Sequence, residues 1–74
     1  MSTFFDFPQN PFHSLPENER PSVLIVDDLV LVCHSLKMLL HQTGQYREIW
    51  QAHNGKEACE LVRQFHPDVI LMDI

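Results

Sequence analysis

Three aspartates carry the clearest potential for chemistry in this sequence, namely Asp27, Asp28 and Asp73. Each follows directly on an apolar run or on another aspartate. Two carboxylates about 4 Å apart repel by roughly 4 kcal/mol at an effective dielectric near 20, so such a cluster must hold a proton or recruit a cation. Oxygen ligands favour Mg²⁺ or a similar hard ion. A carboxylate beside such an ion can attack phosphorus and form an acyl phosphate.

The apolar runs that precede these aspartates predict strands. Residues 23–26 are four consecutive apolar, mostly β-branched residues, and residues 69–72 form a similar run before Asp73. This composition is typical of parallel strands that are buried on both faces. Residues 48–52, which include Ile49 and Trp50, predict a shorter strand between them.

Two apolar stripes with helical spacing separate the predicted strands. The first stripe consists of Val32, Leu36, Leu39 and Leu40. It ends before Gly44, which suits the left-handed position just past a helix. The second stripe consists of Ala58, Leu61, Val62 and Phe65. Asn54 can cap that helix, and His66-Pro67 ends it because a residue before proline is steered out of helical geometry.

The order strand, helix, strand, helix, strand predicts an α/β fold with a parallel sheet and right-handed crossovers. In open sheets of this kind, ligands bind at the carboxyl ends of the strands. If the first and third strands are neighbours, Asp27, Asp28 and Asp73 converge there. Each aspartate also has an ordinary structural interpretation as loop residue or helix cap, and only their combination at one sheet edge favours function.

The overall composition narrows the function classes. The 74 residues include five Lys and Arg against ten Asp and Glu, a net charge of −5, which disfavours direct binding of nucleic acid or of anionic lipid. The longest apolar run, residues 29–33, is far shorter than the roughly 20 residues that span a membrane. The first residues lack a signal-peptide pattern, so we expect a cytoplasmic location. Cys33 and Cys59 lack metal-ligand spacing, which favours free thiols.

Residues 1–21 differ in composition from the rest and are predicted to be a disordered leader, with one domain over residues 22–74. The leader contains four of the five phenylalanines and shows no helical or alternating period. Its Phe-Phe-Asp-Phe-Pro stretch is either a docking motif for a partner or part of an extended tail that packs lightly on the domain.

Three motifs together resemble the first half of the response-regulator receiver domain of two-component signalling. They are Val-Leu-Ile-Val-Asp-Asp at 23–28, Ala-His-Asn-Gly-Lys-Glu-Ala at 52–58, and Pro-Asp-Val-Ile-Leu-Met-Asp-Ile at 67–74. Their order and spacing both match the family, and the resemblance covers about residues 21–74.

The resemblance implies a flavodoxin-like sheet of five parallel strands in the order 2-1-3-4-5, with helices on both faces. Asp73 matches the phosphoacceptor that becomes a 4-aspartylphosphate. Asp27 and Asp28 match the acidic pair that binds magnesium together with Asp73. By this match, Asp28 contacts the ion directly and Asp27 contacts it through a water molecule. The implied partner is a sensor histidine kinase or a phosphotransfer protein, and the full-length protein could dimerise. Such a domain is a signalling phosphoacceptor more than an enzyme.

The sequence departs from the family in stopping one residue after Asp73. We therefore expect a truncated receiver with only the first three strands and two helices, in which the magnesium site is incomplete. Two alternatives stay open at this point. One is a fragment of an aspartyl-phosphate-forming phosphatase built around Asp73, which would leave the Asp27-Asp28 pair without a role. The other is a non-catalytic interaction fragment that binds through its Phe-rich leader.

Overall fold

The computed structural model describes residues 15–73, in which strands and helices alternate as predicted. A short 3₁₀ turn comes first, and the elements in chain order are η2 (Glu17–Glu19), β1 (Ser22–Asp27), α1 (Val30–Thr43), β2 (Glu48–Ala52), α2 (Gly55–Phe65) and β3 (Val69–Asp73). Among these residues, no helix is both long enough and apolar enough to cross a membrane. The predicted leader falls mostly on residues 1–14, which lie outside the described range, and it stays a prediction.

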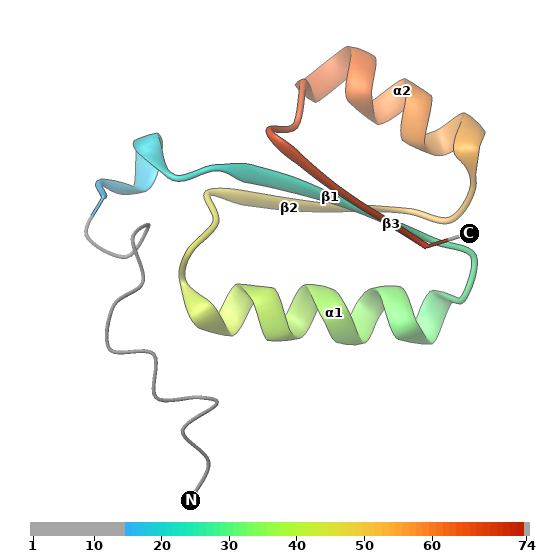
Figure 1. The fold of residues 1–74 in the computed structure, drawn as a ribbon, viewed down its shortest axis with the longest axis horizontal. Coiled ribbons are helices and arrows are strands. Elements are labelled where there is room, and N and C mark those ends of the chain that lie inside the picture. Colours follow the sequence, from blue (N-terminus) through green and yellow to red (C-terminus); the bar gives the residue numbers. More distant parts are fainter. Residues whose placement is uncertain (1–14, 74) are drawn as a thin grey trace, which may run out of the picture.

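The three strands form one parallel sheet in the order β2-β1-β3, with α1 on one face and α2 on the other (Figure 1). The ladder aligns Val26 with Ala52 on one side of β1 and Asp27 with Asp73 on the other. The α/β class and the predicted order of the first three strands are thereby confirmed.

The core is centred on β1, whose six residues are all buried. Its four apolar side chains are at most 1% exposed. On the α2 side, Leu24 and Val26 cluster with Ala52 of β2 and Ala58 of α2. Because helices lie against both faces of β1, the strand needs apolar residues at every position, which is the pattern of its sequence.

Helix α1 ends where predicted, but of the predicted stripe only Leu36 and Leu40 are half-buried. Gly44 caps the helix in the left-handed conformation, with φ 68°, and its N–H donates to the carbonyl of His41. The residue of α1 that is buried is Cys33, whereas Val32 and Leu39 of the predicted stripe are 40% and 59% exposed. The expectation that those two face the core is therefore wrong. The helix is rotated so that Cys33 lies over Ile25 of β1.

Helix α2 begins with a reciprocal capping arrangement. The N–H of Glu57 donates to Oδ1 of Asn54 at 2.9 Å, and the Glu57 carboxylate accepts from the N–H of His53 at 2.8 Å. One backbone donor of the first turn, at Glu57, and one donor just before the helix, at His53, are satisfied in this way. The helix ends at His66, which has a positive φ of 51° and precedes Pro67. The predicted cap and the predicted end are both confirmed.

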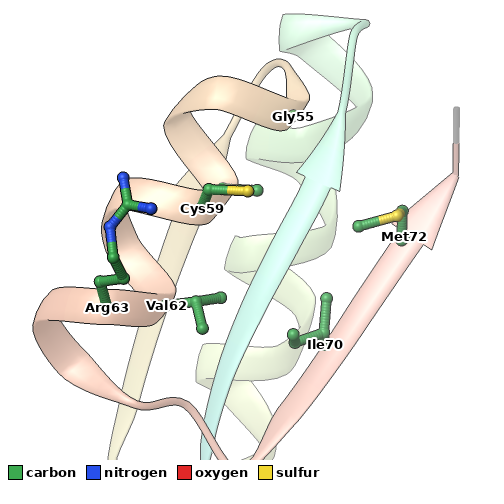
Figure 2. Close-up of a pocket in the computed structure, with 7 residues that line it drawn as sticks. Gly55, Cys59, Val62, Arg63, Ile70 and Met72 are labelled. Carbon is green, nitrogen blue, oxygen red and sulfur yellow. The ribbon is translucent and has the colours of Figure 1, made fainter.

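Strand β3 is far more exposed than its sequence predicts. Ile70, Leu71 and Met72 are 44%, 41% and 57% exposed. Helices α1 and α2 both pack over β1 and β2, and neither helix contacts β3. An apolar groove of about 450 Å³ separates α2 from β3, and Figure 2 shows Val62 and Ile70 on its two walls. The expectation of a strand buried on both faces is wrong for these residues because neither described helix covers it.

The amino ends of β1 and β3 are joined by a cluster of hydrogen bonds between Ser22 and Asp68. The Asp68 carboxylate accepts from the backbone N–H of Ser22 at 2.8 Å and from its hydroxyl at 3.1 Å. The backbone N–H of Asp68 in turn donates to the Ser22 carbonyl at 3.1 Å. The two bonds that Ser22 donates to the carboxylate, with a smaller contribution from Arg47 at 3.7 Å, hold the pKa of Asp68 below its ordinary value.

We expect Asp68→Asn to lower the melting temperature most near neutral pH. The folded-state pKa is depressed, so the stabilisation is fully present above the ordinary carboxylate pKa of about 3.9 and is lost as pH falls through the lower folded-state value. The difference from wild type, measured by circular dichroism from pH 7 to pH 3, should narrow at the acid end. Glu60→Gln, which neutralises an exposed carboxylate on α2, is the matched control. A difference that is constant across this range would contradict the assignment.

Candidate functional site

The structure brings two of the three predicted site residues together at the carboxyl ends of neighbouring strands. Asp27 and Asp73 are aligned partners in the β1-β3 ladder. Aligned residues on parallel strands lie roughly 4.8 Å apart and project from the same face of the sheet. Both line a shallow pocket of about 190 Å³ whose apolar wall includes Ile25, Leu36 and Leu71. An anionic pair is thus set against an apolar surface at the edge where ligands bind in open α/β sheets.

The adjacent carboxylates Asp27 and Asp28 occupy different environments. Asp27 is 4% exposed, and its Oδ1 accepts a hydrogen bond from the backbone N–H of Leu29 at 2.9 Å. Asp28, the first residue after β1, is exposed. Asp27 is therefore held in place with one oxygen already engaged, whereas Asp28 is accessible from outside.

The donor chemistry of this edge fits a hard divalent cation, since carboxylate oxygens are the ligands that Mg²⁺ prefers. Within the described residues, however, no group of three or more His, Cys, Asp or Glu side chains is arranged to hold a metal ion. Asp27 and Asp73 are aligned, and Asp28 follows Asp27 in the chain. The assignment of all three as metal ligands, and of Asp73 as phosphoacceptor, stays a prediction.

Cys33 lies beneath the site and was not predicted to belong to the core. It is completely buried in the first turns of α1, with its Sγ 3.7 Å from the carbonyl oxygen of Ile25. Burial, and then the negative charge of Asp27, raise the pKa of its thiol. The sequence did contain a signal, because Cys33, Leu36 and Leu40 share helical spacing and free cysteine behaves as a small apolar residue.

The chain resembles known proteins over the same segment that forms the sheet. The sequence model of the response regulator receiver domain family matches residues 23–74. The transcriptional regulatory protein YdfI of Bacillus subtilis is 48% identical over 52 residues, which is 70% of this chain and 24% of that protein. The sensor kinase/phosphatase LuxN of Vibrio harveyi is 42% identical over 57 residues, 77% of this chain and 6% of that protein. No solved structure matches significantly.

A third relative bears the name of an enzyme. A protein-glutamate methylesterase/protein-glutamine glutaminase of Mesorhizobium japonicum is 40% identical over 50 residues, 68% of this chain and 15% of that protein. The chain therefore spans less than a quarter of the length of each of these three relatives. Proteins with such different names share this segment, which indicates a common module rather than a common activity.

Fold and site define an α/β domain with an acidic edge at the carboxyl ends of its parallel strands. The family match covers most of the chain, and the chain belongs to the response regulator receiver domain family of two-component systems. This membership favours the receiver over the phosphatase fragment that the sequence left open.

The two cysteines should differ sharply in reactivity. Cys59 is exposed on α2, whereas Cys33 is buried with a raised pKa, and the thiolate is the form that reacts. We expect a thiol reagent such as DTNB to label Cys59 quickly and Cys33 only after unfolding. Cys59→Ser should leave a native chain that labels slowly and a denatured chain that labels fully. Rapid labelling of the native Cys59→Ser variant would show that α1 does not cover Cys33 as described.

Proposed function

We propose that this chain is the phosphoacceptor segment of a two-component receiver and that Asp73 takes the phosphoryl group. The observation that carries the proposal is the alignment of Asp73 with Asp27 at the carboxyl edge of the sheet. Asp73 is exposed, so a phosphodonor can reach its carboxylate. The receiver family membership supports the same role.

In the proposed transfer, a carboxylate oxygen of Asp73 attacks the phosphorus of a phosphohistidine. A new P–O bond forms, the P–N bond breaks, and the imidazole leaves and takes up a proton, which yields an acyl phosphate on the chain. The protein contributes mainly position and electrostatics to such a step. Here the Leu29 N–H fixes Asp27 beside the attacking group, and apolar side chains line the pocket next to both carboxylates.

Asp27, Asp28 and Asp73 would together hold a magnesium ion. When bound, that ion supplies positive charge that offsets the charge of the carboxylates and of the phosphoryl group. The two environments described above support a division of roles in which Asp28 contacts the ion directly. Asp27, buried and with one oxygen engaged, would act through water.

The proposed partner is a sensor histidine kinase or a phosphotransfer protein, and the proposed role is that of a cytoplasmic signalling domain rather than an enzyme. Next to Asp28, the start of α1 exposes Leu29, Val30 and Leu31 by 60%, 58% and 81%. Apolar side chains that flank the acidic edge suit contact with a partner protein. The net charge of −5 does not suit direct contact with nucleic acid. Dimerisation of the full-length protein stays a prediction.

We expect Asp73→Asn to abolish phosphorylation. Because the relatives extend well beyond the matched segment, the test uses a chimera in which residues 1–74 are continued by the residues that follow the matched segment in the Bacillus subtilis relative. Incubation with acetyl phosphate and magnesium should add one phosphoryl group, measured by intact-protein mass spectrometry. The amide of asparagine is not nucleophilic enough to accept it.

Glu60→Gln in the same chimera serves as control, since Glu60 is an exposed carboxylate on α2, away from the acidic edge. It should be labelled like wild type. Undiminished labelling of the Asp73→Asn variant would contradict the assignment of Asp73. Loss of labelling in both variants would show that carboxylate position does not decide the reaction, and it would contradict the proposal as well.

The magnesium assignment predicts unequal effects at the acidic pair. Asp28→Ala should weaken magnesium binding by more than about tenfold, because it removes a direct ligand, and Asp27→Ala should weaken it less. Isothermal titration calorimetry on the same chimera measures both, and circular dichroism checks that the buried Asp27 site still folds. Equal and negligible effects of the two substitutions would instead identify the pair as ordinary loop residues.

A further inference from the structure

A polar pocket at the other end of the sheet gathers most of the positive charge of the described chain. Three of the five Lys and Arg residues of the sequence, Arg20, Lys37 and Arg47, line it together with His41. The pocket has a volume of about 420 Å³ and lies between the last turns of α1, the start of β2 and the segment around η2. In Figure 1 these segments meet at the end of the molecule opposite the carboxyl ends of β1 and β3.

The two arginines of this pocket are held in position by the fold. The Arg20 side chain donates to the carbonyls of Leu15 at 3.1 Å and Gly44 at 2.9 Å. Arg47 is anchored through its backbone N–H, which donates to the Pro21 carbonyl at 2.8 Å, while its Nε is buried with no hydrogen-bond partner among the described residues. Cations that are already ordered lose less conformational entropy when a ligand binds.

The residues that line the pocket carry a net charge opposite in sign to that of the chain. They include three cations and two carboxylates, Glu17 and Glu48, whereas the whole chain carries −5. Arg47 also lies 3.7 Å from the carboxylate of Asp68, which does not line the pocket, so a phosphate would share this arginine with Asp68. Its lining residues come from α1, from the loop 44–47 that follows it, from the start of β2 and from residues 17–20, on the β2 side of the sheet and away from β3. Its volume falls within the range of about 300 to 1,000 Å³ that is usual for small-molecule sites.

We propose that this pocket binds a small phosphorylated molecule, with the phosphate contacted by Lys37, Arg47 and His41. Arginine forks and lysine ammonium groups are the usual partners of phosphate, and charged hydrogen bonds are the stronger ones. The site is separate from the acidic edge, where three carboxylates would repel an anion in the absence of a cation. The proposal therefore does not depend on phosphorylation of Asp73.

The test is a titration of the 74-residue chain with inorganic phosphate, followed by ¹⁵N NMR in the presence of a chelator and at constant ionic strength. We expect saturable shifts centred on the amides of Gly44, Tyr46 and Arg47, which line the pocket. Lys37→Gln should raise the dissociation constant by about fivefold or more, since it removes one charged contact. His41→Gln is a second variant that leaves Lys37 in place and should also weaken binding.

Lys56→Gln is the matched control, because it removes the same charge from an exposed position on α2. It should bind phosphate like wild type, and so should Asp73→Asn, which separates this site from the proposed phosphoacceptor. Shifts that do not saturate, or an equal loss of affinity in Lys37→Gln and Lys56→Gln, would overturn the proposal. The cations would then serve only to complement the carbonyl end of α1.

Discussion

The burial of β1 on both faces is the constraint that places the other elements. Its backbone pairs with β2 on one side and β3 on the other, so its carbonyl and N–H groups are satisfied within the sheet. Its apolar side chains are buried only if another layer covers each face of the sheet, and α1 and α2 form those two layers. Asp27 is the last residue of this strand, so the position of the acidic edge follows from the position of the most buried strand.

Local signals explain why so much of the fold could be predicted from sequence. Residues 48–52 were predicted as a strand and form β2 with the same bounds, and Asn54 and Gly44 cap the helices as expected. Each of these features depends on residues within one turn or one strand of each other. The neighbouring position of β1 and β3 was left as a condition by the residues alone, and the order 2-1-3 was implied by the resemblance to the receiver family; the structure has that order. That arrangement aligned Asp27 with Asp73.

Features that depend on distant residues were not predictable in the same way. The Ser22-Asp68 hydrogen bonds join positions 46 residues apart, and neither residue stands out in the sequence. Helical spacing around α1 allowed two overlapping stripes, and only contact with Ile25 decides that Cys33 faces the sheet rather than Val32 or Leu39. The apolar run of β3 has the composition of a buried strand, but burial also requires a covering layer, which composition does not reveal.

The acidic pair shows how position can give two identical side chains different properties. Asp27 lies within the ladder, above the buried Cys33, and accepts the N–H of Leu29, so its carboxylate cannot move without breaking that bond. Asp28 is one residue further on, beyond the end of β1, and is exposed. A fixed, partly satisfied carboxylate is suited to shaping the charge of a site, and an accessible one is suited to exchanging ligands with solvent. Because β1 ends between Asp27 and Asp28, these two adjacent aspartates have these two different properties.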